Sequence, residues 1–80
     1  MFGLKSKYMD KQYQRNALVD MQEWSDRLFK SERSDEKLAT MQSMVPLVDK
    51  AYNNKLTRED MIMVVALLKH SEYLLKEDKS

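Results

Sequence analysis

The chain has 80 residues, of which 14 are Lys or Arg and 13 are Asp or Glu, so its formal net charge is +1. A chain of this length forms one domain, near the size at which a single core only just outweighs chain entropy, and its balanced charge argues against a strongly electrostatic partner. The absence of cysteine excludes a disulfide framework, thiolate metal sites and a cysteine nucleophile, and one Gly and one Pro are too few for a turn-rich β fold.

The first predicted element is a helix over residues 7–30. Its apolar residues recur at steps of four, four, three and four, which places them on one helical stripe that we expect to face the core. Gln14 is expected to face away from that stripe. Residues 1–6 are expected to form a mobile N-terminal arm. The stripe consists of Tyr13, Ala17, Met21, Trp24 and Leu28.

The second predicted helix covers residues 35–52. Ser34 is a suitable N-cap, and Asn53 and Asn54 are suited to end the helix, because Asn tolerates the left-handed backbone conformation. Pro46 lies inside the helix and removes one backbone hydrogen bond, so a kink near it is expected rather than a break. The predicted apolar stripe has steps of three and four and consists of Leu38, Met41, Val45, Val48 and Tyr52.

The third predicted helix covers residues 57–76, and residues 77–80 are expected to form a frayed tail. Thr57 and Asp60 have the spacing of a capping box, with Leu56 and Met61 placed to form a hydrophobic staple. Residues 61–68 are eight consecutive apolar residues. A helix that is apolar on every side has to be buried all round, and we therefore expect this run to be covered by a partner chain.

Short connections between three helices favour antiparallel neighbours. We therefore predict an all-α protein, with residues 1–80 forming a single up-down-up three-helix bundle. A helical hairpin with a separate long helix that pairs between chains is the alternative. The chain lacks an apolar segment of signal-peptide or membrane-spanning length, and with the missing cysteines this predicts a cytoplasmic protein.

The function expected from the sequence is contact with another protein, as a homodimeric regulator, adaptor or inhibitor of a larger protein. Methionine suits surfaces that accept another protein's apolar residues, and Met44 and Met63 lie off the predicted stripes. His70 is the single histidine and no glycine-rich loop exists, so neither an enzyme nor a cofactor is expected. The predicted interface consists of Met44, Met63, Val64, Leu67 and Leu74.

A nucleic-acid-binding accessory protein is the alternative function. The first sixteen residues hold four basic side chains and one acidic one, and tyrosines lie between them, which suits contact with phosphates and stacking on bases. The candidate residues are Lys5, Lys7, Tyr8, Lys11, Tyr13 and Arg15. This interpretation predicts binding that weakens steeply with salt.

Residues 49–60 resemble an EF-hand calcium loop between two helices. Asp49, Asn53, Lys55 and Asp60 match its first, fifth, seventh and twelfth positions, while Ala51 supplies no oxygen at the third. The resemblance implies calcium binding as a minor alternative. A helix end, a short linker and a capped helix start need the same residues, so both interpretations stay open at this point.

Overall fold

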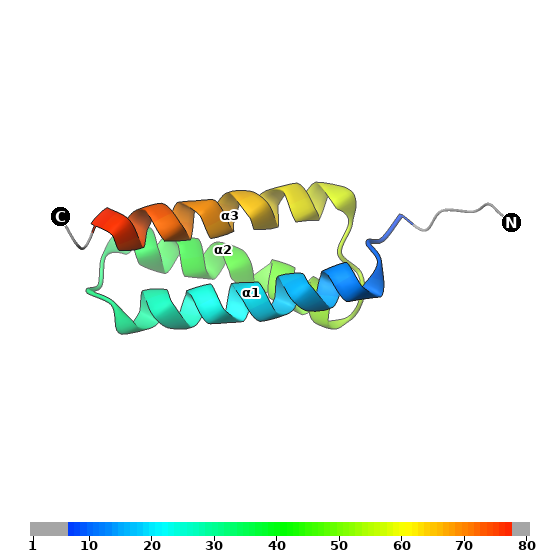
Figure 1. Cartoon of the computed structure of the whole chain (residues 1–80), viewed down its shortest axis with the longest axis horizontal. Helices are drawn as coiled ribbons and strands as arrows, with labels where there is room; N and C mark the ends of the chain where they lie inside the picture. Colours follow the sequence, from blue (N-terminus) through cyan, green and yellow to red (C-terminus); the bar gives the residue numbers. More distant parts are fainter. Residues whose placement is uncertain (1–6, 78–80) are drawn as a thin grey trace, which may run out of the picture.

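The protein is described by a computed structural model, which covers residues 7–77. Three helices run up, down and up and pack side by side (Figure 1). They are α1 (Lys11–Lys30), α2 (Asp35–Tyr52) and α3 (Arg58–Glu77). The predicted all-α class and three-helix bundle are confirmed. The arm predicted at residues 1–6 lies outside the described residues, as do residues 78–80 of the tail predicted at 77–80, whereas Glu77 is the last residue of α3.

Helix α1 begins four residues later than predicted. Asp10 is its N-cap and accepts a hydrogen bond from the backbone N–H of Gln12 at 2.8 Å. The residues before it are extended, because Tyr8 forms an isolated β-bridge with Thr57 and the Met9 N–H donates to the carbonyl of Leu56 at 2.7 Å. The chain before α1 therefore pairs with the connection between α2 and α3 instead of extending the helix.

Helix α2 has the predicted start and end. Ser34 Oγ accepts from the Lys37 N–H at 3.2 Å. At the other end Asn54 has a φ of 60°, and the Lys55 N–H donates to the carbonyl of Lys50 at 2.8 Å, which is the Schellman arrangement. The helix continues through Pro46, so the proline does not split it, and the kink there stays a prediction.

The capping box at the start of α3 is confirmed. Thr57 Oγ1 accepts from the Asp60 N–H, and an Asp60 carboxylate oxygen accepts from the Thr57 N–H, both at 3.1 Å. Leu56, the residue before the cap, is fully buried, and Met61 packs against the same cluster. The start of α3 is therefore fixed by polar contacts on the surface and by an apolar contact inside.

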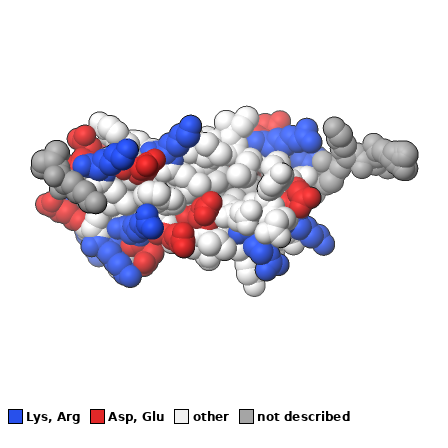
Figure 2. Space-filling model, viewed as in Figure 1, with Lys and Arg blue, Asp and Glu red and all other residues white. Residues whose placement is uncertain are grey.

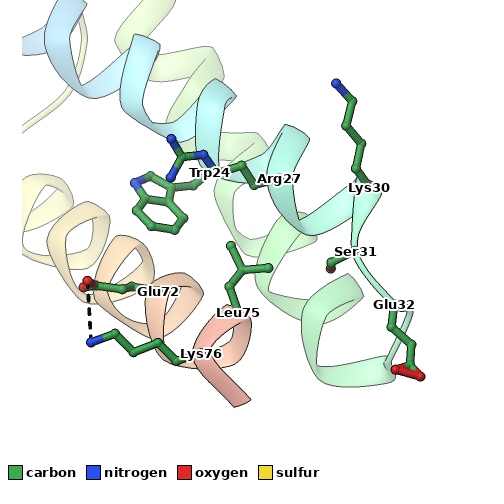
Figure 3. A pocket seen from close by; sticks show the side chains of 8 residues that line it. All are labelled: Trp24, Arg27, Lys30, Ser31, Glu32, Glu72, Leu75 and Lys76. Carbon is green, nitrogen blue, oxygen red and sulfur yellow. Dashed lines mark ion pairs between the residues drawn. The ribbon is translucent and has the colours of Figure 1, made fainter. Parts of the chain in front are cut away.

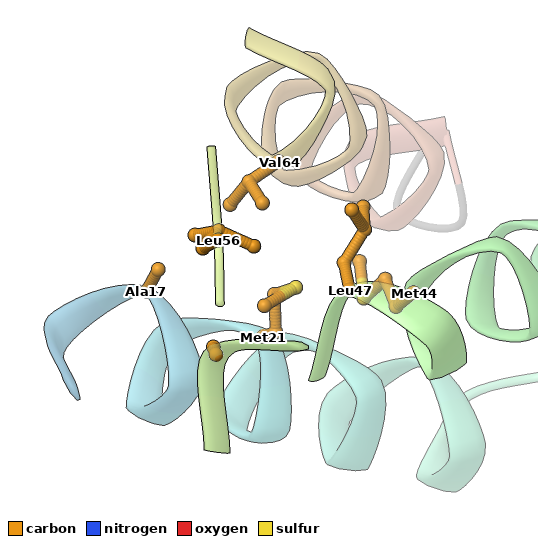
Figure 4. Packing of buried hydrophobic residues seen from close by; sticks show 7 residues of the cluster. Ala17, Met21, Met44, Leu47, Leu56 and Val64 are labelled. Carbon is orange, nitrogen blue, oxygen red and sulfur yellow. The ribbon is translucent and has the colours of Figure 1, made fainter. Parts of the chain in front are cut away.

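The core is built from all three helices and from the α2–α3 connection. Its buried side chains point into the space between the helices (Figure 4). Leu18, Trp24 and Leu67 are among the partly buried side chains that pack around it. The central cluster consists of Ala17, Met21, Met44, Leu47, Ala51, Leu56 and Val64.

Gln14 lies in the interior, so the expectation that it faces away from the core is wrong. Its side chain is buried, its amide nitrogen donates to the carbonyl of Met9 at 2.8 Å, and its amide oxygen accepts from the N–H of Leu56 at 2.7 Å. A buried backbone group without a partner is costly. Gln14 is inside because it satisfies two backbone groups where the chain crosses the end of the bundle.

The buried face of α2 is displaced by one residue from the predicted stripe, which is therefore wrong as a core face. We call the predicted stripe the outer seam, because Leu38, Val45 and Tyr52 are exposed and Met41 and Val48 are only partly covered. The residues that face the core form the inner seam, which consists of Lys37, Thr40, Met44, Leu47 and Ala51. The two seams have the same spacing and lie about 100° apart around the helix.

The bundle accepts the more polar inner seam because its polar groups have partners. Lys37 Nζ donates to the carbonyl of Glu32 at 2.6 Å, and Thr40 Oγ1 donates to the carbonyl of Glu36 at 2.8 Å. Ala51 and Thr40 are small, which lets neighbouring helices approach closely. Helical periodicity alone does not distinguish the two seams, and packing decides between them.

Candidate interaction surfaces

The more apolar seam of α2 is turned toward the surface: Leu38, Val45 and Tyr52 are exposed, and Val48 packs in part against the core. Val45 is 64% exposed and Tyr52 is 74% exposed. The five side chains of the outer seam follow one another at steps of three, four, three and four, so they form a nearly straight apolar line along four turns of helix. A line of this kind is the surface that a facing helix packs against.

The outer seam lies on the side of α2 that borders α1. Tyr52 lines a hollow of about 300 Å³ together with Leu18 and Val19 of α1. The side chains of α2 that reach α3 lie on the opposite flank, where Glu36 pairs with His70 at 3.0 Å and Lys50 pairs with Asp60 at 3.2 Å. The apolar surface therefore continues from α2 toward α1.

Helix α1 adds an aromatic ring to this surface. Phe29 is exposed and lies eleven residues after Leu18, on the same flank of α1. The guanidinium carbon of Arg33 lies 5.3 Å from the centroid of the Phe29 ring. The combined surface is apolar along its length and carries arginine at both ends, since Arg15 lines the hollow beside Tyr52.

A second apolar surface lies on α3, within the predicted run of eight apolar residues. Ile62 is 72% exposed, and Val65, Ala66 and Tyr73 lie on the same outward side of the helix. Lys69 falls between these residues and interrupts them. The run is therefore divided: Val64 is fully buried, Met61, Leu67 and Leu68 are partly covered, and the outward side remains open.

Most of the predicted interface residues lie inside the bundle. Met44, expected to be exposed, is 1% exposed and belongs to the core, because it stands on the inner seam of α2. Val64 and Leu74 are buried as well, and Leu67 packs against the core. Met63 is the one member of the predicted set that is well exposed, at 54%. The four covered residues already have their contacts within the chain.

A hollow of about 620 Å³ lies between the C-terminal halves of α1 and α3 (Figure 3). Trp24 and Leu75 form its apolar floor, and the guanidinium carbon of Arg27 lies 4.8 Å from the Trp24 ring centroid. Glu72 and Lys76 pair across four residues at 3.8 Å on its rim. The rim carries both signs of charge, so the hollow does not select an anion or a cation.

The residues of the nucleic-acid alternative do not share one face. Lys11 and Arg15 are exposed on α1, but Tyr13 is two residues from each and therefore about 200° away around the helix axis. Tyr8 is partly buried in its bridge to Thr57, and the ammonium of Lys7 lies 5.3 Å from the Tyr8 ring centroid. Lys5 lies outside the described residues. This function stays a prediction.

Two carboxylates of the loop that resembles an EF-hand, those of Asp49 and Asp60, accept hydrogen bonds within the chain. Asp49 lies in the last turn of α2 and receives a hydrogen bond from the Asn53 side chain. The hydrogen bond from the Thr57 N–H holds the pKa of Asp60 below its ordinary value, and the Lys50 ammonium contributes. Across residues 7–77 no group of three His, Cys, Asp or Glu side chains is placed to hold a metal ion.

The surface carries no large field of one sign on the face seen in Figure 2, where basic and acidic side chains alternate around an uncharged middle. His70 pairs with Glu36, and its ring stacks on Tyr73 with centroids 6.2 Å apart. None of the three helices in the described part of the chain has the length and apolar content to cross a membrane.

Comparisons of the chain with protein-family models, with curated proteins and with solved structures find no match. The residues of the outer seam were visible in the sequence as an apolar stripe, but their exposure was not. The contact between Gln14 and Leu56 gave no local signal, because it joins residues 42 positions apart. The exposed apolar seam is therefore the main feature from which a function can be argued.

Proposed function

We propose that this chain is a small, non-enzymatic protein–protein interaction module, acting as a regulator, adaptor or inhibitor. Its outer seam on α2 would bind a helix of a partner chain, either a second copy or another protein. The observation that supports this is the orientation of α2, which turns its more apolar seam outward and its more polar seam inward. Exposed apolar surface in a continuous line is typical of an interaction site.

The spacing of the seam specifies the kind of partner. Side chains at steps of three and four on one helix fit between those of a second helix laid along it. The neighbouring flank of α1, with Leu18 and Phe29, widens the line into a shallow groove. A helix placed there would complete a four-helix arrangement, in which α2 is covered on both of its apolar sides.

The outer side of α3 supports the proposal less strongly. Ile62 and Val65 are exposed, but Lys69 interrupts the apolar line, and Arg58 adds a second charge at its start. The centre of a protein–protein interface typically contains few charged residues. The outer seam of α2 meets that condition along its whole length, and the α3 surface does not.

A photoreactive amino acid at position 45 tests the proposal. Irradiation of cells that express this variant should yield a covalent adduct of defined mass, because Val45 lies at the middle of the outer seam. The matched control places the same photoreactive residue at Glu23, which is exposed on α1 away from α2. Equal labelling at both positions, or none at position 45, would overturn the proposal.

A further inference from the structure

We propose that the outer seam is occupied by α3 of a second copy, which lies in the groove between α1 and α2 with its exposed side inward and runs opposite to α1. This inference rests on the proposed function and specifies its partner. It is argued from the charges that border the groove, from the charges that border the exposed side of α3, and from the one register that brings them together.

The α1 side of the groove carries a basic residue at each end. Arg15 lines the hollow at one end, and Arg33 lies over the ring of Phe29 at the other. Both arginines are exposed, and neither forms an ion pair within the described part of the chain. Asp26, the acidic residue on this flank of α1, is paired with Lys30 at 3.0 Å. A helix in the groove should therefore turn acidic side chains toward α1.

The α2 side of the groove carries acidic residues instead. Asp35 and Asp49 lie next to the outer seam, on the flank that turns away from α1, and Gln42 lies midway between them. All three are exposed, and neither carboxylate forms an ion pair with another described residue. A helix in the groove should therefore turn basic side chains toward this flank.

The exposed side of α3 has the complementary arrangement. Arg58 and Lys69 each precede an exposed apolar residue by four positions, which places them about 40° to one side of it. Glu59 precedes Ile62 by three positions and lies about 60° to the other side. The apolar line thus lies between two edges of opposite charge. The basic edge consists of Arg58, Lys69 and Lys76, and the acidic edge consists of Glu59 and Glu77.

The charges fix the direction of the copy's α3. Successive residues of α1 face α3 (Trp24), α2 (Ser25) and the groove (Asp26). On α3 the step from Arg58 to Glu59 crosses the exposed side from the basic to the acidic edge. Because both helices are right-handed, the acidic edge faces α1 only when α3 of the copy runs opposite to α1. In the other direction each edge would meet its own sign of charge.

One pair of opposite charges sets the register. In this direction α3 of the copy runs parallel to α2, so the numbers of residues that lie side by side on these two helices differ by a constant. Placing Arg58 of the copy beside Asp35 gives a difference of 58 − 35 = 23. Lys69 of the copy then lies beside residue 46, within one turn of Asp49. The second basic residue therefore meets the second acidic residue without further adjustment.

Positions along α1 follow from a contact between α1 and α2. Ser25 Oγ lies 3.2 Å from Met44 Sδ. The two helices are antiparallel, so the numbers of α1 and α2 residues at the same level add up to 25 + 44 = 69. Arg15 is therefore level with residue 54, and Phe29 is level with residue 40.

The acidic edge of the copy's α3 meets these positions in the same register. Glu77 of the copy comes to residue 77 − 23 = 54, the level of Arg15. Glu59 of the copy comes to residue 36, about one turn from Phe29 and from Arg33 over its ring. One pair was used to set the register, and three further pairs of opposite charge follow from it.

The apolar residues between the charged edges face the outer seam in this register. A small residue of α3 comes to the middle of the seam, which lets the two helices approach closely, and a larger side chain lies on each side of it. The facing pairs are Ile62 of the copy with Leu38, Ala66 with Val45, and Tyr73 with Tyr52.

The two surfaces lie on opposite sides of the bundle, since the exposed side of α3 and the groove face away from each other. Each copy can therefore use both surfaces at once, and a contact of this heterologous kind forms an open series. An antiparallel pair of outer seams on a two-fold axis through Val45 would instead set Arg15 against Arg33 of the copy. Charge complementarity therefore selects α3 of the copy as the occupant.

Complementation between two variants is the first test, by sedimentation equilibrium from low micromolar to millimolar concentration. The mass of the native chain should rise beyond that of a dimer. Val45→Asp alone and Ile62→Asp alone should each weaken association about 100-fold or more. An equal mixture of these variants should form a dimer and nothing larger, because one intact groove meets one intact α3.

Glu23→Lys, at an exposed position on α1 outside both surfaces, is the control and should associate like the native chain. A native chain that stays monomeric or stops at a dimer would overturn the inference. So would a mixture of the two variants that does not associate.

Cysteine pairing tests the direction and the register, since the chain has no cysteine of its own. With oxidised glutathione as the oxidant, a mixture of Leu38→Cys and Ile62→Cys chains should link mainly as heterodimers. Tyr52→Cys mixed with Ile62→Cys is the matched control and should not link, because the two positions lie about 20 Å apart along the helices. Preferential linking in the control mixture would contradict the direction assigned to α3.

Charge exchange tests the pair that sets the register. Asp35→Lys or Arg58→Glu alone should weaken association about fivefold, since each sets two like charges side by side at an exposed position. A chain with both substitutions should associate like the native chain. Failure of the double variant to restore association would overturn the assigned register.

The photoreactive residue at position 45 separates this inference from the proposed function. An adduct with a second copy should be attached within residues 58–77. If the native chain is monomeric while position 45 captures a different protein, the second copy is wrong and the proposed function stands. If position 45 captures nothing, both are wrong.

Discussion

The two seams of α2 show how adjacent residues in one helix have opposite surroundings. Met44 is 1% exposed and Val45 is 64% exposed, although both are apolar and both lie in a regular helical pattern. The inner seam contains Lys37 and Thr40, whereas the outer seam has no residue more polar than Tyr52. Hydrophobicity alone therefore does not decide which seam is buried.

The difference is decided by how α2 is rotated about its own axis, and the ends of the helix hold that rotation. Leu56 lies four residues after the end of α2 and is buried in the core, where its N–H donates to Gln14 and its carbonyl accepts from the N–H of Met9. A helix whose connection is anchored in this way cannot turn by 100° without breaking those contacts. The polar contacts at one end of the bundle thus determine which apolar surface is left for a partner.

The largest expected effect on stability comes from placing the same substitution in each of the two seams. Met44→Asp should lower the free energy of unfolding by about 4 kcal/mol or more, because it removes a core side chain and buries a charge without a partner. Val45→Asp should change it by less than about 0.5 kcal/mol, as expected for an exposed position. Urea unfolding followed by circular dichroism, at concentrations where the chain is monomeric, measures both. Similar losses in the two variants would show that the outer seam is not on the surface.

The features that the sequence predicted well depend on residues close together in the chain. Ser34 with Lys37, Thr57 with Asp60, and Asn54 at the end of α2 all act within one helical turn. Their chemistry is local, so the residue types and their spacing are sufficient to place the helix ends. The start of α1 was misplaced because Met9 is held by Leu56, which is 47 positions away.

The interaction surface was predictable only in part, for the same reason. The sequence indicated surplus apolar surface on α3, and Ile62 and Met63 are indeed exposed. It assigned Met44 to the surface and Val45 to the core, which is the reverse of their positions. Both assignments assumed that the more apolar of the two seams is buried. Which seam the protein buries depends instead on the contact between Gln14 and Leu56, which are 42 residues apart.

The next largest effect on the free energy of unfolding is expected when the contact that anchors Leu56 is removed. Gln14→Leu should lower the free energy of unfolding by about 2 kcal/mol, because the buried N–H of Leu56 loses its acceptor. Hydrogen exchange at the Leu56 amide should become faster, and the free energy of opening calculated from the exchange rate should fall by a similar amount. Gln12→Leu, at an exposed position in the same turn, is the control and should be nearly neutral. A loss in the control alone would mean that the Gln14 contact does not hold the end of the bundle.

The capping box should make stability depend on pH in the acid range. The Thr57 N–H and then Lys50 lower the pKa of Asp60 below its ordinary value of 3.8. A carboxyl whose pKa is lower in the folded state stabilises that state above the unfolded pKa, and the contribution disappears as the pH falls through the folded value. The native chain should therefore lose stability relative to Asp60→Asn below about pH 4.

The difference between these two proteins at neutral pH should be about 1 kcal/mol, the usual effect of a helix cap. The comparison is made with the midpoints of urea unfolding, measured between pH 2 and 7, because this pH range includes the ordinary pKa values of carboxyl groups. Glu59→Gln changes the neighbouring exposed carboxylate and is the matched control. A pH profile altered equally by both substitutions would show that the acid dependence does not come from the capping box.

The smallest expected effect concerns the backbone turn that ends α2. Asn54 has a φ of 60°, where glycine has no steric cost, so Asn54→Gly should raise the free energy of unfolding by about 0.5 kcal/mol. Asn53 has a φ of −95° and its side chain donates to the Asp49 carbonyl at 2.8 Å, so Asn53→Gly should lower it by about 1 kcal/mol. Thermal and urea unfolding of the two variants would show opposite signs. If both substitutions changed the free energy of unfolding in the same direction, Asn54 would not be the left-handed residue of this turn. The turn would then not hold α2 in the rotation that exposes the outer seam.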